Sequence, residues 1–342
     1  MDISLLLLSW YQDNRRILPW RKDKDPYHVW ISEIMLQQTR IEAVISYYER
    51  FIERIPDIFT LANISEDELL KLWEGLGYYS RARNLKKAAM MIMNDFGGVF
   101  PSIYEEILKL PGIGEYTASA IASICFGAKT PTIDGNVLRV YTRMLEDERN
   151  VDLSRTKKQI REEIEKIMPK DTGNFNEAFM ELGEVVCLPS GKPKCEVCPL
   201  KEKCCAYKHQ SWSKFPVKTL KQDKKEYFYT VFLLCYQDKV VIRKRTDGLL
   251  KNLWEFPSVL GKMSLKEIKT LLKTQNIAFK SVHKSVSHKH VFSHQIWYMQ
   301  AYVITLTKYE PSFCWASGME LCEKYAIPGA FQPFLKAFLH NI

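Results

Sequence analysis

The spacing of apolar residues divides the chain into a helical part and a mixed part. From Ile41 to Ile55 the apolar positions recur every three or four residues, which predicts an amphipathic helix. A further helix is predicted from Arg83 to the Gly97-Gly98 pair, because glycines commonly end helices. Alternation typical of strands begins only after about residue 225. The first two-thirds are therefore expected to be all-α.

Two short motifs predict capped helix starts within the helical part. A Ser followed three residues later by Glu can satisfy two backbone amides reciprocally. Ser65 with Glu68 has this spacing, and so does Ser102 with Glu105. We therefore expect Ser65 and Ser102 to be helix N-caps.

The last third of the chain predicts an α+β domain. Runs rich in β-branched and aromatic residues predict strands at Phe228–Tyr236, Val240–Arg243 and Val291–Thr307. Helical spacing returns at Leu265–Leu272 and at Phe331–Leu339. Strands and helices that are grouped in this way are typical of an α+β fold.

A lysine-rich stretch around Pro216 predicts an exposed linker between the two parts. Its lysines are Lys214, Lys218, Lys221, Lys224 and Lys225. The predicted organisation is a helical domain at 1–212, a basic linker at 213–226 and the α+β domain at 227–342.

Length and composition agree with two folded domains. The chain has 342 residues, of which 46% are hydrophobic, so it can bury substantial cores. Its net charge of +9 suits a polyanionic partner but does not prove one. The apolar run Leu5–Leu8 is too short for a signal peptide or a membrane span. We therefore expect a soluble cytoplasmic protein with no membrane partner.

A glycine-containing turn lies at Leu110–Ala118, between two helical patterns. Gly112 and Gly114 would let backbone amides face outward, and the next helix start adds a positive dipole end. Such a turn can hold a phosphate, and a plain helix-turn-helix packing corner is the alternative.

This turn, followed by Asp134, resembles the helix-hairpin-helix glycosylase superfamily, which includes endonuclease III. The resemblance implies a hairpin near 108–120 that contacts DNA phosphate, with a monovalent cation at its turn. It also implies that Asp134 lies at the mouth of a base pocket. A helix N-cap is the simpler role for Asp134, and the two roles are compatible because capping amides would keep the carboxylate ionised.

Tyr116 separates this chain from the bifunctional members of that superfamily. Those members have a lysine at this position, whose amine attacks C1′ to form a Schiff base. Tyrosine cannot form an imine, and Lys109 and Lys129 do not match the motif position. The sequence therefore predicts a glycosylase without efficient lyase activity.

Glu33 lies in a very apolar helical neighbourhood, where burial would raise its pKa and favour a protonated carboxyl. An exposed glutamate at a helix start is the alternative. However, Trp30–Arg40 resembles the adenine DNA glycosylase (MutY) family almost residue for residue. Residues 75–81 and 175–178 match the same family.

The resemblance implies a role for each candidate residue. Glu33 would protonate N7 of adenine, and Asp134 would act as an electrostatic partner or as a transient nucleophile, with both options open. Asn136 and Tyr116 would orient Asp134 and water. The residues that would line the adenine pocket are Trp20, Arg21, Leu36 and Glu177. Gln38 and Tyr78 would act as wedges inserted into the duplex, with Gln37 alongside.

Four cysteines, Cys187, Cys195, Cys198 and Cys204, form a C-x7-C-x2-C-x5-C pattern. Four thiolates can hold a zinc ion or a [4Fe-4S] cluster, and spacing alone does not decide. The glycosylase resemblance favours one [4Fe-4S] cluster in a loop at 187–204. The first gap has one residue more than the usual pattern, and Cys205 is a fifth candidate.

The resemblance extends into the last third through Leu253–Pro257 and Val291–His294, which are similar to the family's Nudix-like domain. It implies that Phe292, Ser293 and His294 recognise 8-oxoguanine opposite the adenine. A zinc site formed by His288, His290 and His294 is an alternative, but no cysteine or acidic residue accompanies these histidines as a further ligand. The helix at Leu265–Leu272 lacks the paired glutamates of a Nudix hydrolase, so this domain is expected to have no hydrolytic activity.

Together these features predict a monomeric base excision repair glycosylase. Its expected substrate is adenine opposite 8-oxoguanine or guanine in double-stranded DNA. Two alternatives stay open, an endonuclease III-like lyase acting on oxidised pyrimidines and a non-catalytic iron-sulfur protein that binds DNA.

Overall fold

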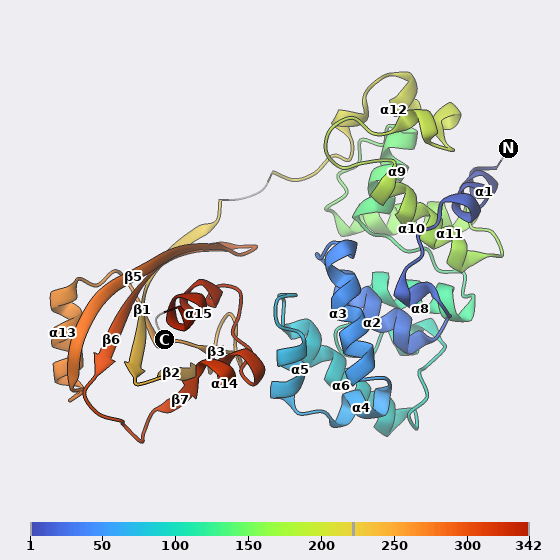
Figure 1. Cartoon of the computed structure of the whole chain (residues 1–342). Helices are drawn as coiled ribbons and strands as arrows, with labels where there is room; N and C mark the ends of the chain where they lie inside the picture. Colours follow the sequence, from blue (N-terminus) through green and yellow to red (C-terminus); the bar gives the residue numbers. More distant parts are fainter. Residues whose placement is uncertain (1, 221–222, 341–342) are drawn as a thin grey trace. The chain divides into compact units, whose positions relative to one another are not determined.

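The computed structural model describes residues 2–220 and 223–340, and its contacts divide the chain into two compact units (Figure 1). Unit 1 comprises Met1–Asn63 and Asn84–Leu220, and unit 2 comprises Ile64–Arg83 and Lys221–Ile342. Residues 221 and 222 of the predicted linker, including Lys221, lie outside the described residues. The helical segment at 64–83 is thus grouped with the C-terminal part.

Unit 1 consists of helices joined by short loops and 3₁₀ turns. Its helices are α1 (Ile3–Asn14), α2 (Pro26–Leu36), α3 (Ile41–Arg54), α4 (Ile58–Asn63), most of α6 (Ser80–Asp95), α7 (Tyr104–Ile107), α8 (Glu115–Phe126), α9 (Gly135–Leu145), α10 (Ser154–Ile167), α11 (Thr172–Val185) and α12 (Cys205–Lys208). Its 3₁₀ turns are η1 (Pro19–Arg21), η2 (Cys195–Val197), η3 (Lys201–Lys203) and η4 (Trp212–Lys214). None of the described helices of the chain is long and apolar enough to cross a membrane.

Helix α11 is the centre of the packing that positions the candidate site. It lies beside α1, α8 and α9 (Figure 1). Phe175 and Phe179, one helical turn apart on α11, are buried with Leu7 of α1 and Val140 of α9. This cluster fixes α11 against α9, so side chains on the remaining faces of the two helices share one cavity.

The predicted helix starts are confirmed in part. The Ser65 hydroxyl accepts a hydrogen bond from the Glu68 amide (3.2 Å) at the start of α5 (Glu66–Leu72). The prediction for Ser102 is wrong, because α7 begins at Tyr104 and Ile103 is its N-cap, without a side-chain hydrogen bond. The hydroxyl therefore stands one residue too early. The helix that was expected from Arg83 begins at Ser80.

Unit 2 is built on one mixed sheet with helices on both sides (Figure 1). Its strands are β1 (Lys225–Tyr236), β2 (Lys239–Lys244), β3 (Trp254–Glu255), β4 (Ser258–Leu260), β5 (Phe279–Val291), β6 (Gln295–Leu306) and β7 (Cys314–Ser317). Besides α5, its helices are α13 (Leu265–Thr274), α14 (Gly318–Glu323) and α15 (Gln332–Leu339). The main strand order is β3-β2-β1-β6-β5, in which β1 and β6 pair in parallel.

Successive side chains of β1 point to opposite faces of the sheet, so the strand contributes apolar residues to the core on each face. Val231 and Leu233 belong to a cluster that includes α15, whereas Phe232 and Leu234 belong to a cluster that includes α13. The predicted α+β class of this part is confirmed. A strand buried on both faces also explains why β1 reads as a continuous apolar run.

The predicted strand Val291–Thr307 is wrong at its start. Val291 ends β5, and β6 begins at Gln295, so residues 292–294 form the turn of a hairpin. Strand β5 itself was not predicted, because its sequence is rich in Lys, His and Ser and much of it is exposed. Its pairing with β6 compensates for this weak apolar pattern.

The segment 64–83 is held within unit 2 by polar contacts. The carboxylate of Glu74 accepts hydrogen bonds from the Ile327 amide (2.8 Å) and the Gln332 side chain (3.1 Å). Lys71 donates to the carbonyl oxygen of Tyr325 (3.0 Å). These contacts join α5 and the turn after it to the segment that precedes α15.

Candidate active site

A cavity of about 290 Å³ in unit 1 contains most of the predicted catalytic and pocket residues. It is bounded by α2, by the segment around η1, and by the facing parts of α8, α9 and α11. Both Glu33 and Asp134 line it, so the two carboxyl groups share one cavity as predicted. The other predicted residues that line it are Trp20, Arg21, Leu36, Tyr116, Asn136 and Glu177.

Glu33 is a buried acid on the inner face of α2. Asp25 caps this helix through the Tyr27 amide (2.8 Å), and the neighbours of Glu33 along α2 are mostly buried apolar residues. Only 7% of Glu33 is exposed, and burial raises its pKa to about 7, against a hydrogen bond with Tyr116 that lowers it. Its Oε2 has no hydrogen-bond partner among the described residues. A carboxyl group in this state can hold a proton near neutral pH.

Tyr116, on the first turn of α8, faces Glu33 inside the cavity. Burial and the neighbouring carboxyl groups of Glu33 and Asp134 raise its pKa well above the usual value, so the phenol stays protonated. The hydroxyl also lies 3.2 Å from the sulfur of Met180, to which it can donate. The phenol therefore works as a fixed neutral hydrogen-bonding group beside the acid.

Asp134 is the N-cap of α9. Its Oδ1 accepts from the Val137 amide (2.7 Å) and its Oδ2 from the Asn136 side chain (2.9 Å), so the predicted capping role is confirmed. These hydrogen bonds favour the ionised carboxylate, as expected, but burial acts against them. Burial raises the pKa of Asp134 above its ordinary value, although both hydrogen bonds act to lower it.

The position of Asn136 is fixed from two sides. Its Oδ1 accepts from Arg139 Nη2 (2.8 Å), which also donates to the carbonyl oxygen of Gly183 (2.8 Å). Gly183 on α11 packs directly against Asn136, because a Cβ added there would lie 2.5 Å from the Asn136 Cβ. The absence of a side chain at Gly183 thus determines how closely α11 approaches the start of α9.

We predict that Gly183→Ala lowers catalysis by displacing Asn136 and, with it, the oxygen that Asn136 holds on Asp134. Relieving the 2.5 Å approach requires a movement of α9 or α11, and overpacking of this kind costs about 1–3 kcal/mol. We expect a lower melting temperature and at least a tenfold lower single-turnover rate. Unchanged values for both would contradict the packing argument.

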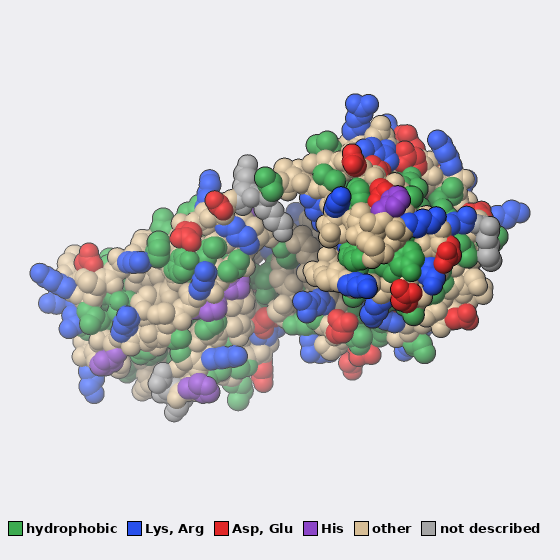
Figure 2. All heavy atoms as spheres, turned by 90° about the horizontal axis from the view of Figure 1, so that it is seen from above, with side chains coloured by type: hydrophobic (Ala, Val, Ile, Leu, Met, Phe, Trp, Pro, Cys, Tyr) green, Lys and Arg blue, Asp and Glu red, His purple; other side chains and the backbone are tan. Residues whose placement is uncertain are grey.

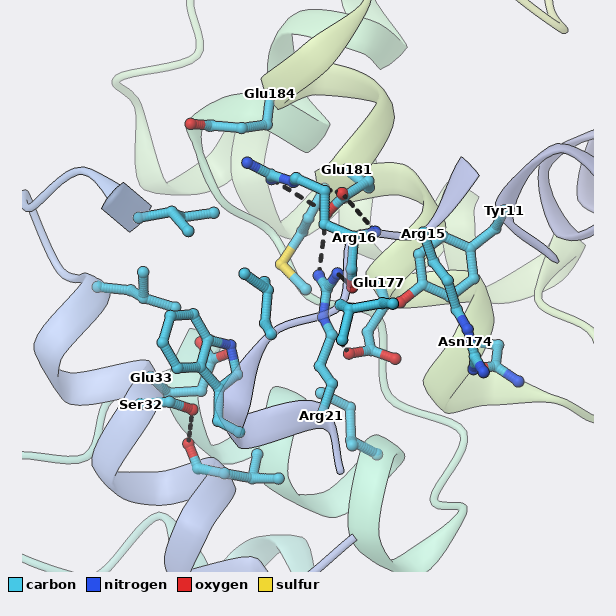
Figure 3. A pocket seen from close by; sticks show the side chains of 18 of the residues that line it. Tyr11, Arg15, Arg16, Arg21, Ser32, Glu33, Asn174, Glu177, Glu181 and Glu184 are labelled. Atoms are coloured by element: carbon cyan, nitrogen blue, oxygen red, sulfur yellow. Dashed lines mark hydrogen bonds and ion pairs between the residues drawn. The ribbon is translucent and has the colours of Figure 1, made fainter. Parts of the chain in front are cut away.

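Two arginines and two glutamates form the wall opposite Glu33 (Figure 3). Arg21 pairs through Nε with Glu177 (3.1 Å) and through Nη2 with Glu181 (3.0 Å), and Glu181 also binds Arg16 (2.5 Å). Burial raises the pKa of Glu177 against the charge of Arg21. Burial also acts to raise the pKa of Glu181, but Arg16 and Arg21 together outweigh it and lower that pKa.

Several residues of this site were not predicted from the sequence, among them Arg16, Met180, Glu181 and Gly183. One pattern was available for Glu181, because it follows Glu177 by four residues and therefore shares its helical face. The other three depend on which helices meet, which no local pattern specifies.

The predicted wedge residues lie outside the lining of this cavity. Gln37 and Gln38 follow α2, where Gln37 donates to the Thr117 hydroxyl (3.4 Å) and Gln38 is exposed. Tyr78, in unit 2, is 46% exposed. Gln38 and Tyr78 both have a positive φ, 59° and 47°, which is uncommon for residues other than glycine. Such strain is typical of residues that are held in place for a function.

The predicted hairpin turn joins α7 to α8. Gly112 has a φ of +80°, which favours glycine, and a Cβ there would lie 2.6 Å from the Asn84 side chain. Both the backbone conformation and the close packing therefore require glycine at this position. Gly114 is the N-cap of α8 and provides no side-chain cap. The amides of the first turn of α8 are therefore accessible to an anion.

The four predicted cysteines line one small hollow beside α9. Cys187, Cys195, Cys198 and Cys204 all face it, together with Arg143, whose Nη1 lies 3.4 Å from the Cys187 sulfur. Cys205, at the start of α12, is not among the described residues that line the hollow. No group of three or more His, Cys, Asp or Glu in the described ranges is arranged to hold a single metal ion. Four convergent sulfurs with an adjacent guanidinium fit an anionic iron-sulfur group.

Comparison with known proteins identifies the family. Residues 31–170 match the HhH-GPD superfamily of base excision DNA repair proteins, and residues 230–337 match the NUDIX domain. An adenine DNA glycosylase of Buchnera aphidicola from Schizaphis graminum is 41% identical over 300 residues, which cover 85% of this chain and 84% of the relative. The human adenine DNA glycosylase is 33% identical over 309 residues, which cover 74% of this chain and 56% of the relative.

This chain belongs to the adenine DNA glycosylase family.

Solved structures agree on the fold of the helical part of this family member. A thermostable thymine-DNA glycosylase superposes with a TM-score of 0.55 at 31% identity, covering 60% of this chain and 95% of that one. A non-covalent endonuclease III–DNA complex gives a TM-score of 0.52 at 24% identity, covering 61% and 96%. The predictions of a DNA-binding, DNA-repair glycosylase and of a helix-hairpin-helix domain followed by a Nudix-like domain are confirmed.

In this adenine DNA glycosylase family member, the predicted recognition residues form the tip of the β5–β6 hairpin. Ser293 and His294 are exposed, whereas the Phe292 ring packs against His290 (4.5 Å) and Trp297 (4.8 Å). The Ser293 hydroxyl lies 2.6 Å from the Tyr78 hydroxyl, within unit 2. Glu267, the one glutamate of α13, is used in a capping box with Ser264.

Proposed function

We propose that this enzyme hydrolyses the N-glycosidic bond of adenine opposite 8-oxoguanine or guanine in double-stranded DNA, without efficient lyase activity. One observation carries the proposal, the buried Glu33 with a pKa of about 7 in the same cavity as Asp134. One protonated and one ionised carboxyl group are what glycosidic bond cleavage requires.

Glu33 supplies the proton in this mechanism. Adenine is a poor leaving group as an anion, and protonation at N7 lets it leave as a neutral base. The unpartnered Oε2 of Glu33 gives the carboxyl group a free position toward a bound base. The hydrogen bond with Tyr116 fixes its orientation.

Asp134 faces the positive charge that develops on the sugar. It stabilises the oxocarbenium-like state either electrostatically or by a transient covalent bond to C1′. Asn136 holds Oδ2 (2.9 Å), and the Val137 amide holds Oδ1 (2.7 Å), so the carboxylate is positioned before the substrate arrives. Asn136 and Tyr116 also orient the attacking water.

The wall of Arg21 and Glu177 selects adenine. A guanidinium and a carboxylate side by side can donate to and accept from the base edge. Trp20 and Leu36 provide the apolar surfaces around it, since Trp20 is buried against Tyr48 (5.4 Å). Glu181 forms a second ion pair with Arg21, which fixes the position of the guanidinium and adds a negative charge beside it.

Base flipping precedes the chemistry, because C1′ of adenine cannot be reached in a stacked duplex. Gln38 and Tyr78 act as wedges with Gln37 alongside, and their exposure and backbone strain support this role. Gly112 and Gly114 hold the phosphate backbone through the amides of the hairpin turn, where a monovalent cation binds.

Recognition of 8-oxoguanine is assigned to Phe292, Ser293 and His294. The exposed serine hydroxyl and imidazole can contact groups that distinguish the oxidised base from guanine. Phe292 packs beneath them and holds the hairpin tip. The 2.6 Å contact between Ser293 and Tyr78 supports a link between lesion recognition and the wedge.

We also propose that Cys187, Cys195, Cys198 and Cys204 hold one [4Fe-4S] cluster. Four thiolate bonds would tie the loop 187–204 together and orient its lysines toward phosphate. We expect purified protein to have a brown iron-sulfur absorbance and Cys198→Ser to lose it, whereas Cys205→Ser keeps it. A colourless wild-type protein that contains stoichiometric zinc would contradict the assignment.

Base release from defined duplexes tests the whole proposal. We expect adenine release from A:8-oxoguanine and A:G duplexes, no release from a thymine glycol duplex, and no stoichiometric borohydride-trapped adduct, because Tyr116 replaces the lysine that an imine requires. Thymine glycol release with a trapped adduct would overturn it. We further propose that the chain acts as a monomer of two domains, whose boundary lies within the expected linker at 213–226.

A further inference from the structure

The net positive charge of this chain is confined to its C-terminal third. Residues 221–342 contain 18 basic residues (Lys and Arg) and 9 acidic residues (Asp and Glu). Residues 1–220 contain 31 basic and 31 acidic residues. The whole formal charge of +9 therefore resides after residue 220. A neutral helical part and a strongly basic second part imply that long-range attraction to a polyanion comes mainly from the second part.

The second part also has a hollow lined by lysines. This hollow, of about 430 Å³, lies on unit 2 between β1, β5 and β6 and the turn after β4. Lys262, Lys284 and Lys289 line it, and no acidic residue of the described chain is among its lining residues. Figure 2 shows Lys and Arg side chains spread over the visible face of this unit.

Aromatic rings hold two of these lysines in place. The Phe228 and Tyr298 rings stack on each other with their centroids 5.2 Å apart. The Lys262 ammonium lies 4.0 Å from the Phe228 centroid, and the Lys289 ammonium lies 5.2 Å from the Tyr298 centroid. Cation–π contacts of this kind restrict a flexible side chain, so less entropy is lost when the ammonium binds an anion.

The other polar groups that line the hollow add no negative charge. The Ser287 hydroxyl donates to the Gln300 side-chain oxygen (2.6 Å), and both groups are neutral. An acid does contact the aromatic pair, since Glu226 accepts a hydrogen bond from the Tyr298 hydroxyl (3.1 Å). One carboxylate at the edge does not neutralise three ammonium groups.

We propose that the hollow formed by Lys262, Lys284 and Lys289 binds phosphates of the DNA backbone, separately from the base recognition assigned to the tip at 292–294. The inference depends on the proposed function only in taking DNA as the polyanion. The three lysines bind phosphates without sequence or lesion preference, so they supply affinity and leave discrimination to the hairpin tip.

Salt-dependent binding of the full chain tests this proposal. The triple variant K262Q/K284Q/K289Q is compared with K266Q/K269Q/K273Q, which removes three exposed lysines from α13 of the same unit. Binding is measured for an undamaged duplex and for an A:8-oxoguanine duplex with a non-hydrolysable adenosine analogue. We expect the slope of log K against log salt to become shallower by about one for each phosphate that the variant no longer binds, and affinity for both duplexes to fall roughly tenfold or more at low salt. The α13 variant should change both quantities much less.

The outcomes separate this proposal from the proposed function. Equal slopes for the two triple variants would overturn the phosphate site, even if adenine release by the wild type is normal. A loss of affinity confined to the 8-oxoguanine duplex would also overturn it, because it would place the lysines in lesion recognition. Conversely, failure of adenine release by the wild type, with the expected change in slope on undamaged DNA, would refute the catalytic proposal and leave the phosphate site standing.

Discussion

Replacing Glu33 with Gln is expected to abolish adenine release while binding to the A:8-oxoguanine duplex survives. Gln has the same shape but cannot donate an acidic proton, and general acids contribute about 10²–10⁴-fold to a rate. Because adenine leaves poorly without protonation, we expect a loss at the upper end of this range in single-turnover experiments. An active Glu33→Gln enzyme would refute the assignment.

The pH dependence of stability provides the control for folding. The pKa of Glu33 is raised from 4.5 to about 7 by burial, so the carboxyl group is accommodated as the neutral form in the folded state. Its stabilising contribution is complete below pH 4.5, is lost as pH rises to about 7 and stays constant above that value. The wild type should lose about 3 kcal/mol more unfolding free energy between pH 4 and pH 8 than Glu33→Gln does. A variant that is inactive and equally pH-dependent would point to damage elsewhere.

The local chemistry of the site was predictable because it depends on short-range patterns. An acid among apolar residues on a helix predicts a raised pKa, and the structure bears this out for Glu33. Asp134 before an amphipathic run predicts an N-cap, and that too is confirmed. The burial that raises the pKa of Asp134 was not predicted, because it depends on α8 and α11, which are distant in sequence.

The long-range parts of the site could not be predicted in the same way. Gly183 is an ordinary helical glycine in the sequence, and its requirement appears only when α11 meets Asn136. Arg16 reaches Glu181 across 165 residues, so no spacing rule connects them. Strand β5 was not predicted for a related reason. Its own apolar pattern is weak, and its pairing with β6 stabilises it as a strand.

Replacing Asp134 with Asn is expected to lower adenine release by about 10²–10⁴-fold with little loss of stability. Asn is as good an N-cap as Asp, so the Val137 amide should keep its partner. The variant removes the negative charge that faces the developing oxocarbenium ion and also removes the nucleophile of a covalent route. Asp57→Asn is the matched control, because Asp57 caps the Thr60 amide (2.7 Å) away from the cavity. The control should retain wild-type activity and melting temperature.

The pH profile distinguishes this role from a structural one. In the wild type, release requires Glu33 protonated and Asp134 ionised, so the rate should fall as pH rises above about 7 and fall again as pH drops through the raised pKa of Asp134. In Asp134→Asn the fall at low pH should disappear, because no carboxylate remains at that position to be protonated. The fall above about pH 7 should remain, since Glu33 still supplies the proton. A variant that keeps both limbs would show that Asp134 only holds α9, and the second carboxyl group of the reaction would have to be sought among Glu177, Glu181 and Glu184, which line the same cavity.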